Sequence, residues 1–568
     1  MKSSFKKFHQ LLMDLYADVV TEKDIEIYSQ IFDHDTERKN YKWSEKDIFL
    51  ITYGDSITKE GQNPLESLHS FLEKYLKGFI NGVHILPFFP YSSDDGFSVI
   101  DFFKVDENLG TWEDIKKIGN DYKLMCDLVI NHASSQSNWF QEFLKETPHY
   151  SDFFIEENPD TDLRMVVRPR TSPLLAAFQT KQKIKYVWTT FSDDQIDLNF
   201  KSLAVFNQMV KALIYYLMNG SQVIRLDAIA FLWKEAGTSC LHHANTHKIV
   251  KMLRLIAEQS NPDAIILTET NVPNQENLSY FGNNDEADMV YQFSLPPLLI
   301  HCLYAGTSLY LNRWAATLPD LPPNCTFFNF TSSHDGIGVR PLEGILPKVE
   351  FDRVVEQAKC NGAMVSYRNL PDGSKTPYEL NITFFDVLKD IYQSDSNWTE
   401  RFICSQIIML EMRGIPAFYF HSLLASPSWY SGFEQTQRAR TLNRQKYTME
   451  YLDELLGAVD NIRSGIFHEL LRICKIRKLQ PAFHPSSKQN IVNCGEKYFI
   501  LVRQSDQQKI LCVSNITSQN QKIDTGILGL SSNKKNINLI TNMPLDMEYY
   551  LIKLKPYQCI WVDMGAKD

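Results

Sequence analysis

The sequence predicts an α/β protein organised around a (β/α)8 TIM barrel, with inserted subdomains and a C-terminal antiparallel β-sandwich. Three observations support this fold class. Short runs of β-branched and aromatic residues alternate with longer helix-like stretches, as in repeated parallel βα units. Eight such runs occur before residue 421, and eight parallel strands close a barrel. After about residue 490 only strand-like runs remain, joined by polar links rich in Ser and Asn.

The eight runs are the predicted barrel strands. In a barrel of this kind, polar side chains at the C-terminal strand ends are the first place to look for chemistry. In chain order the runs are 47–53, 82–87, 124–131, 222–227, 264–270, 287–293, 326–331 and 415–420.

The spacing of the runs predicts where other domains are inserted. About ninety residues separate the third run from the fourth, and over eighty separate the seventh from the eighth, which is more than a βα unit needs. We therefore expect an inserted domain B and a second inserted domain B′. The predicted ranges are 47–132, 201–335 and 400–488 for the barrel, 133–200 and 336–399 for the insertions, and 489–568 for the C-terminal β domain.

Residues 1–46 are charged and carry a helical pattern. Leu11, Leu12, Tyr16 and Val19 are spaced by one, four and three residues, which favours a helix with one apolar face. We expect a helical N-terminal extension that packs on the barrel.

The composition excludes several classes of protein. There are 58 Lys and Arg against 68 Asp and Glu, a net charge of −10, which argues against nucleic acid as a partner. No apolar run approaches the roughly 18 residues of a membrane helix, so no membrane partner is expected. The N-terminus lacks the uninterrupted apolar core of a signal peptide, and the ten cysteines form no CxxC pair. These features predict reduced thiols and a cytoplasmic location.

Acids and bases follow four of the predicted strands. Asp127 and His132 lie at the end of strand three, Asp227 ends strand four, Glu269 ends strand five, and Asp335 follows strand seven. One polar side chain on a barrel rim is ordinary, but several converging on one rim indicate a reactive site.

Two carboxylates on neighbouring strands suit cleavage of a glycosidic bond, in which one attacks the anomeric carbon and the other protonates the leaving oxygen. Asp227 and Glu269 fit these roles. Arg225, two residues earlier on the same strand face, is expected to lower the pKa of Asp227. Glu269 follows an aliphatic strand, so desolvation is expected to raise its pKa.

The segments DLVINH, RLDAIA, TETN and SSHD, in this order and spacing, resemble the four conserved regions of the α-amylase family of retaining α-glycosidases and transglycosidases, glycoside hydrolase family 13. The resemblance implies that Asp227 is the nucleophile and Glu269 the general acid/base. It also implies that Asp335 grips sugar hydroxyls and distorts the ring, while His132 and His334 bind hydroxyls of the same glucosyl unit.

Further segments are similar to the sucrose phosphorylase subfamily rather than to starch-degrading amylases: GVHILPFFP, SSDDGFSVID, WKEAGTSC, SLPPLLIHCL, HDGIGV and LNRQKY. This likeness implies that Asp94 and Arg444 join the glucosyl subsite and that Phe97 and Phe191 form its apolar wall. Within the subfamily, the N-terminal extension and the stretches VWTTFSDDQIDLNF and FNFTSSHDGIGVRPL look most like the glucosylglycerate phosphorylase branch.

A phosphorylase must let phosphate, rather than water, attack the glucosyl-enzyme, which calls for fixed cationic donors beside the leaving-group site. Arg168 and Arg170 supply two, and their segment resembles the acceptor loop of the subfamily. Tyr378, in the second insertion, is expected to join them. A carboxylate acceptor such as glycerate would use the same cations.

No metal and no other cofactor are expected. His242, His243 and His247 include an i, i+4 pair, but no HExxH pattern accompanies it, so a structural role is predicted. The residue corresponding to Asn131 contributes to a calcium site in many amylases, whereas the phosphorylase branch is not expected to carry that ion.

The sequence thus predicts a retaining α-glucoside phosphorylase. The expected reaction converts glucosylglycerate and inorganic phosphate into α-glucose 1-phosphate and glycerate through a β-glucosyl-aspartate. Sucrose or sucrose 6-phosphate phosphorylase is one alternative, and an α-glucosidase or transglucosidase is another. An inactive amylase-like binding protein is an alternative from a different class, and the presence of all three acids argues against it. The sequence leaves the oligomeric state open.

Overall fold

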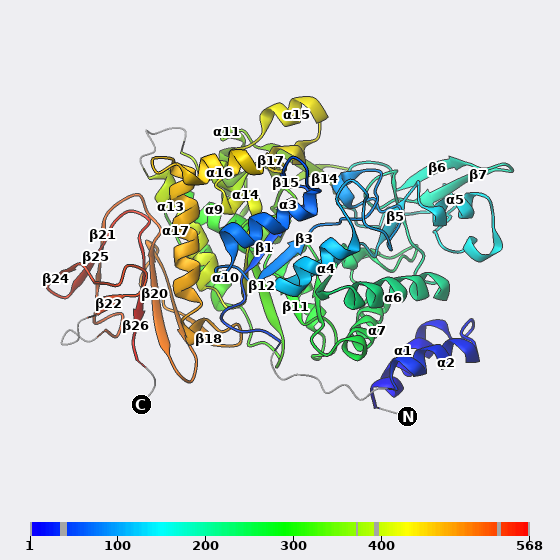
Figure 1. Ribbon diagram of the computed structural model, residues 1–568, viewed down its shortest axis with the longest axis horizontal. Helices are drawn as coiled ribbons and strands as arrows, with labels where there is room; N and C mark the ends of the chain where they lie inside the picture. Colours follow the sequence, from blue (N-terminus) through cyan, green and yellow to red (C-terminus); the bar gives the residue numbers. More distant parts are fainter. Residues whose placement is uncertain (1–2, 34–41, 371–372, 391–396, 531–535, 566–568) are drawn as a thin grey trace.

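The protein is described here by a computed structural model, which covers residues 3–33, 42–370, 373–390, 397–530 and 536–565. At its centre is a closed barrel of eight parallel strands (Figure 1), and this confirms the predicted fold class. Each strand overlaps one of the eight predicted runs. Around the barrel the order is β1 (Phe49–Thr52), β16 (Ile415–Tyr419), β12 (Thr326–Phe330), β11 (Met289–Tyr291), β10 (Ile265–Thr268), β9 (Ser221–Leu226), β4 (Lys123–Leu128) and β3 (Gly82–Ile85).

The barrel strands are apolar because both of their faces are covered. Every residue of β1, β3, β10, β12 and β16 is buried. Helices pack outside the barrel, and their starts follow ordinary capping rules. At α3, Asn63 accepts the Glu66 N–H at 2.8 Å, Glu66 accepts the Asn63 N–H at 3.2 Å, and Pro64 is the first helical residue. The covering helices include α3 (Pro64–Phe71), α4 (Trp112–Asp121), α6 (Leu203–Met218), α7 (Ala244–Ser260), α9 (Leu295–Ala305), α10 (Leu309–Ala316), α13 (Trp398–Glu411), α16 (Met449–Gly457) and α17 (Ile462–Arg477).

Two long connections carry additional strands. Between β4 and α6, the hairpin of β6 (Leu175–Gln179) and β7 (Ile184–Trp188) extends to the right-hand end of Figure 1, and β5 (His132–Ser134) pairs with β8 (Gln195–Asp197). Helix α5 (Asn138–Leu144) packs in the same connection. Between β12 and α13, the strands β13 (Ile337–Gly338), β15 (Lys375–Asn381) and β14 (Met364–Asn369) form an antiparallel sheet next to α11 (Lys348–Cys360).

The C-terminal part contains two antiparallel sheets, at the left of Figure 1. Ile500, Val513 and Ile552 belong to one buried cluster that joins the two sheets. The larger sheet has the order β18 (Lys488–Ile491), β19 (Tyr498–Gln504), β20 (Lys509–Asn515), β26 (Cys559–Asp563), β22 (Ile537–Asn538) and β23 (Met543–Pro544), and the smaller has β21 (Gln521–Asp524), β25 (Leu551–Leu554) and β24 (Met547–Glu548).

Two helices, α1 (Ser3–Tyr16) and α2 (Glu22–Ile31), precede the barrel and pack against α6 and α7. The Tyr16 hydroxyl donates to the Phe200 carbonyl at 2.8 Å. The buried face of α1 is not quite the predicted one: Leu12 and Tyr16 are buried, but Val19 is 57% exposed because the helix ends at Tyr16.

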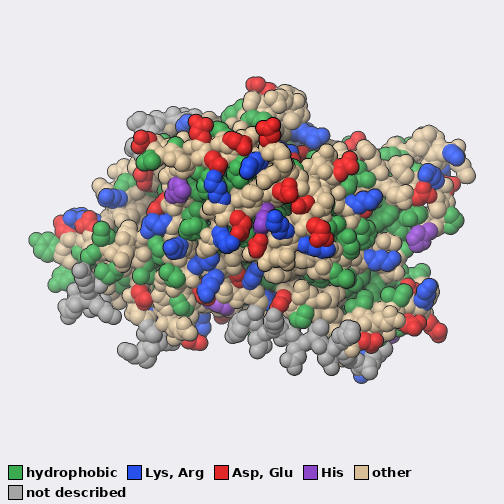
Figure 2. Space-filling model, viewed as in Figure 1, with side chains coloured by type: hydrophobic (Ala, Val, Ile, Leu, Met, Phe, Trp, Pro, Cys, Tyr) green, Lys and Arg blue, Asp and Glu red, His purple; other side chains and the backbone are tan. Residues whose placement is uncertain are grey.

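The surface carries both signs of charge. On the face seen in Figure 2, basic and acidic side chains are interspersed. In the part of the chain that the structure describes, no helix combines the length and the apolar character that a membrane crossing requires.

Candidate active site

The predicted acids stand at the C-terminal ends of the barrel strands. Asp227 directly follows β9, and Glu269 directly follows β10. The parallel ladder continues to both residues: the Asp227 N–H donates to the Leu128 carbonyl at 3.1 Å, and the Glu269 N–H donates to the Leu226 carbonyl at 3.1 Å. The strands themselves therefore fix the positions of the two carboxylates.

An inner pocket of about 60 Å³ adjoins an outer one of about 560 Å³, and the two share six lining residues. Ten of the predicted site residues line the inner pocket: Asp94, Phe97, His132, Arg170, Phe191, Asp227, Glu269, His334, Asp335 and Tyr378. Arg444 lines the outer pocket. The structure thus brings together eleven of the thirteen predicted residues around two adjoining cavities, and Arg225 lies beneath them.

Arg225 is almost fully buried and joins the carboxylates below the pocket. Its Nη1 lies 2.9 Å from Asp227 Oδ1 and also donates to Asp127 Oδ1. Its Nη2 lies farther from Glu269, at 3.9 Å from Oε2. His84 Nε2 approaches the other oxygen of Asp127 at 2.6 Å. Although burial acts to raise it, the charges of Arg225 and His84 lower the pKa of Asp127 to about 2.

Burial raises the pKa of Asp227 well above its usual value, and the neighbouring Glu269 adds to the rise. Arg225 opposes this shift, as the sequence predicted, but it does not outweigh burial. The net direction is therefore opposite to the one expected from the sequence. Burial also raises the pKa of Glu269, as expected. The two carboxyls together retain a proton to a higher pH than two free carboxyls would.

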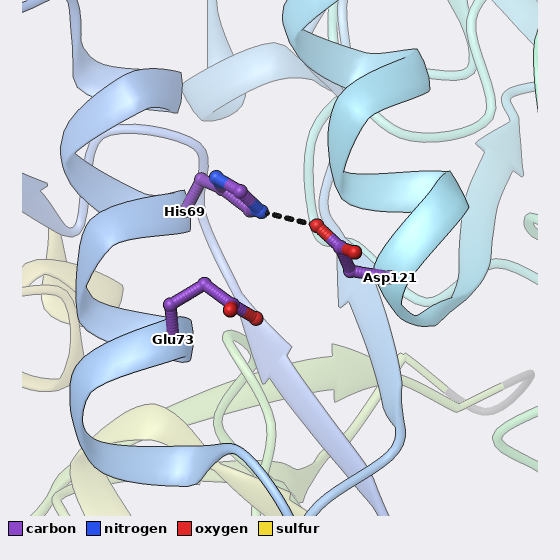
Figure 3. Close-up of side chains that lie close together, drawn as sticks. All are labelled: His69, Glu73 and Asp121. Carbon is purple, nitrogen blue, oxygen red and sulfur yellow. Dashed lines mark hydrogen bonds and ion pairs between the residues drawn. The ribbon is translucent and has the colours of Figure 1, made fainter.

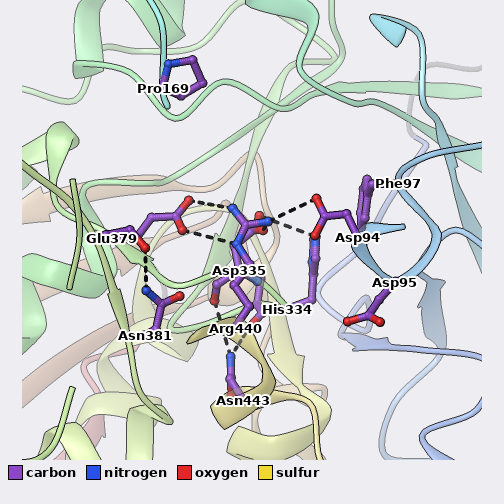
Figure 4. A network of polar contacts seen from close by, with 12 residues as sticks. Asp94, Asp95, Phe97, Pro169, His334, Asp335, Glu379, Asn381, Arg440 and Asn443 are labelled. Carbon is purple, nitrogen blue, oxygen red and sulfur yellow. Dashed lines mark hydrogen bonds and ion pairs between the residues drawn. The ribbon is translucent and has the colours of Figure 1, made fainter. Parts of the chain in front are cut away.

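Arg440 links three further acids, Asp335, Asp94 and Glu379 (Figure 4). Its Nη1 lies 2.7 Å from Asp335 Oδ1 and 3.7 Å from Asp94 Oδ2, and its Nη2 lies 2.8 Å from Glu379 Oε1. Burial acts to raise the pKa of Asp335, but Arg440 and His334 hold it well below its usual range. Asp335 is thus ionised at neutral pH and can accept hydrogen bonds from sugar hydroxyls.

A strained turn carries two further acids, Asp94 and Asp95, to the pockets. Asp94 and Asp95 both have positive φ angles, of 52° and 48°, and Gly96 follows at 108°. Arg444 Nη1 holds this turn, at 2.6 Å from Asp95 Oδ2 and 3.7 Å from Asp94 Oδ1. Backbone strain and an ion pair therefore both fix where Asp94 lies.

Aromatic rings form one wall of the inner pocket. The Phe97 ring stacks on His334, with centroids 4.7 Å apart and planes at 4°. Phe191 lies 5.3 Å from the His132 ring. His132 Nε2 is 2.9 Å from the Phe97 carbonyl and 3.1 Å from Gln195 Nε2, which orients the imidazole.

The two predicted acceptor arginines have different environments. Arg168 lines neither pocket, and its Nη2 donates to the carbonyls of Pro173, Thr189 and Thr190 at 3.0–3.2 Å, so this end of the guanidinium binds the loop backbone. Arg170 lines both pockets, and its Nη1 has a 3.4 Å bond to the Pro169 carbonyl. The structure therefore brings only Arg170 to the site.

Four polar residues of the inner pocket were not predicted from the sequence: Gln195, Asn271, Glu379 and Arg440. Asn271 comes two residues after Glu269, and Glu379 directly follows Tyr378, so both adjoin predicted residues. Arg440 comes four residues before Arg444 in the loop after the last barrel strand, and a second arginine there was a usable signal.

The histidines after strand four have protein partners. His242 lies 3.0 Å from the Tyr280 hydroxyl and 3.1 Å from Glu276, and His247 Nδ1 lies 2.6 Å from Glu286. Among the described residues, His69, Glu73 and Asp121 form a surface group that could hold an ion, with His69 Nε2 2.8 Å from Asp121 (Figure 3). None of these three residues lines the inner or the outer pocket.

The ammonium group of Lys234 lies beside Asn131, the residue whose counterpart contributes to a calcium site in many amylases. Lys234 Nζ donates to Asn131 Oδ1 at 2.6 Å and lies 3.4 Å from Asp197 Oδ2. Lys234 is 5% exposed, so its charge neutralises Asp197 within the protein.

A barrel whose strand ends gather three acids around one pocket is typical of enzymes that cleave glycosidic bonds, and residues 58–306 match the family model described as alpha amylase, catalytic domain. The chain belongs to the α-amylase family, glycoside hydrolase family 13. It is 45% identical to the glucosylglycerate phosphorylase of Allomeiothermus silvanus, covering 93% of this chain and 92% of the relative. It is 40% identical to that of Escherichia coli strain K12, covering 93% of each chain. The solved structure of sucrose 6F-phosphate phosphorylase from Thermoanaerobacter thermosaccharolyticum is 26% identical, with a TM-score of 0.72 and coverage of 83% and 94%.

Proposed function

We propose that this protein is a glucosylglycerate phosphorylase, which converts glucosylglycerate and phosphate into α-glucose 1-phosphate and glycerate. The observation that carries the proposal is the pocket itself, in which three rim acids and two arginines line one cavity. Identities of 40–45% to glucosylglycerate phosphorylases over most of the chain support the substrate, compared with 26% to a sucrose 6F-phosphate phosphorylase.

In the first step, the Asp227 carboxylate attacks the anomeric carbon and the bond to the glycerate oxygen breaks. Glu269 gives its proton to that oxygen, so glycerate leaves with a neutral hydroxyl. The raised pKa of Glu269 favours this acid role. Arg225, 2.9 Å from Asp227 and 3.9 Å from Glu269, favours the ionised form on Asp227.

In the second step, dihydrogen phosphate attacks the anomeric carbon of the β-glucosyl-enzyme. The bond to Asp227 breaks, its electron pair returns to the carboxylate, and one phosphate proton passes to Glu269, which restores the acid. Two inversions at the same carbon retain the α configuration.

The remaining residues bind and orient the two substrates. Asp335, Asp94, Arg444, His132 and His334 would hold the glucosyl hydroxyls, with Phe97 and Phe191 against the apolar face of the ring. Arg170 and Tyr378 would meet phosphate or the glycerate carboxylate, and Arg440 joins them because it lines the same pocket. Arg168 would support the loop that carries Arg170.

The reaction as proposed uses no metal, and Lys234 supplies the positive charge beside Asn131. A cytoplasmic location fits the cysteines: all ten lie in the described ranges, and none is joined in a disulfide.

The proposal is tested by following phosphorolysis of glucosylglycerate by NMR. We expect one α-glucose 1-phosphate for each phosphate consumed, and little free glucose. Free glucose as the main product would indicate a hydrolase, and β-glucose 1-phosphate would exclude the double displacement.

A further inference from the structure

Glu379 places a negative charge where the proposed reaction needs an anion to bind. It lies on β15, is 3% exposed and lines both pockets. Its Oε1 is 2.8 Å from Arg440 Nη2 and 3.9 Å from Arg170 Nη1, so it stands between the two arginines that line the inner pocket. Neither step of the proposed reaction uses this carboxylate.

The two arginines retain donors that can face a ligand. Arg440 offers five N–H groups, and its described bonds go to Glu379 through Nε and Nη2 and to Asp335 through Nη1. Arg170 Nη1 has one weak hydrogen bond, to the Pro169 carbonyl at 3.4 Å. An incoming anion can therefore be bound by both arginines, but it must lie beside Glu379.

A carboxylate paired with arginine can only accept hydrogen bonds. An anion beside it is repelled unless that anion brings an O–H group that donates to the carboxylate, which turns a repulsive contact into a charge-assisted hydrogen bond. The pocket thus requires an anion that is also a donor.

We propose, resting on the function proposed above, that Glu379 restricts the acceptor site to anions that carry a spare O–H group. Dihydrogen phosphate has two O–H groups, and glycerate has two hydroxyls. One passes its proton to Glu269 in the reaction, and the other donates to Glu379. Sulfate has the size and shape of phosphate but carries no proton at neutral pH, so Glu379 excludes it.

The first test uses the wild-type protein. Phosphorolysis of glucosylglycerate is measured at one neutral pH with sulfate as a competitor, and with arsenate, which keeps O–H groups as phosphate does. We expect arsenate to compete about as well as phosphate, and the inhibition constant of sulfate to exceed the KM for phosphate by at least about tenfold. Sulfate that competes as well as phosphate would overturn the inference.

The second test separates this inference from the proposed function. The shift in melting temperature caused by phosphate, arsenate and sulfate reports binding without turnover. If phosphate binds but no α-glucose 1-phosphate forms, the proposed function fails, and the order of the three shifts still decides the inference. Equal shifts for sulfate and phosphate would contradict it.

The third test is Glu379→Gln, which keeps an oxygen for Arg440 and adds an amide that can donate to sulfate. We expect the ratio of the inhibition constant of sulfate to the KM for phosphate to fall by about tenfold or more. The matched control is Glu343→Gln, which removes the same charge from a Glu343–Arg368 pair (2.6 Å) outside both pockets and should leave the ratio unchanged. If Glu379→Gln weakens both anions equally, Glu379 only positions Arg440 and the inference is wrong. If this variant does not fold, the wild-type comparisons decide.

Discussion

Asp227 and Glu269 share one buried arginine unequally, and this difference separates their proposed roles. Arg225 contacts Asp227 directly and stands a further ångström from Glu269. Burial raises the pKa of both carboxyls, so the pair retains a proton to a higher pH than two free carboxyls would, while the closer contact with Arg225 acts to favour the ionised form of Asp227. A nucleophile and an acid can thus arise from two similar side chains on adjacent strands.

We expect Asp227→Asn and Glu269→Gln each to lower turnover by several powers of ten, because each removes a group that acts on the reacting bond. Melting temperature and circular dichroism check that the variants remain folded. Azide should partly restore Glu269→Gln, since an anion needs no general base, and it should not restore Asp227→Asn with retention. Near-normal activity in either folded variant would contradict the assignment.

Arg170 is the predicted acceptor cation that reaches the pocket. Arg170→Ala should raise the KM for both glycerate and phosphate, because losing a charge-assisted hydrogen bond costs about 1.5–3 kcal/mol, or roughly ten- to more than a hundredfold. Hydrolysis by water should fall less. Arg164→Ala is the control, since Arg164 pairs with Asp162 on the surface. Affinities within about twofold of wild type, or under ~0.5 kcal/mol, would remove Arg170 from the acceptor site.

At the scale of single elements, the turn after β3 illustrates how backbone geometry positions the proposed glucosyl subsite. A Cβ on Gly96 would lie 2.5 Å from the Pro87 carbonyl oxygen, and its φ of 108° disfavours side chains as well. Gly96→Ala should therefore lower the melting temperature and weaken binding of the glucosyl donor, by about 1–3 kcal/mol of strain. Gly61→Ala is the control: its φ is also positive, at 76°, but its Cβ meets nothing within 4 Å. Equal effects of the two substitutions on donor KM would contradict this account.

The end of α13 joins the barrel to the C-terminal sheets through a buried acid. Glu411 Oε1 accepts the Trp561 indole N–H at 2.6 Å, and burial raises the pKa of Glu411 to about 8. Because its folded pKa exceeds its unfolded one, its contribution to stability is present below about pH 4.5 and is lost as pH rises toward 8.

In the Glu411→Gln variant, the side chain cannot ionise but can still accept the Trp561 indole N–H. The difference in unfolding free energy between variant and wild type should shift in favour of the variant by up to about 4 kcal/mol from pH 5 to pH 8, at about 1.4 kcal/mol per pH unit. Melting temperatures of both proteins across this range measure the shift. A difference that does not change with pH would show that Glu411 does not titrate there.

For the molecule as a whole, the barrel was predictable because each of its strands is a short continuous run that can be recognised in the sequence. Each run is apolar and ends in polar residues, and closure of the barrel carries Asp227, Glu269 and Asp335 to one rim without knowledge of any loop. The convergence of Glu379 and Arg440 was not predictable, because it depends on how an insertion folds over the loop after β16. Likewise, Arg168 and Arg170 look equivalent in sequence, and only the path of the loop separates them. The net pKa shift of Asp227 required the depth of burial, which sequence does not give.

The central claim is that phosphate and glycerate exchange at one glucosyl-enzyme. The most direct measurement incubates the protein with α-glucose 1-phosphate and, in parallel, with glycerate, fructose, fructose 6-phosphate, glycerol or water, and follows phosphate release. We expect release to be fastest with glycerate, with glucosylglycerate as the product. Faster release with fructose or fructose 6-phosphate would assign the protein to the sucrose phosphorylases, and release with water alone at the same rate would contradict a phosphorylase.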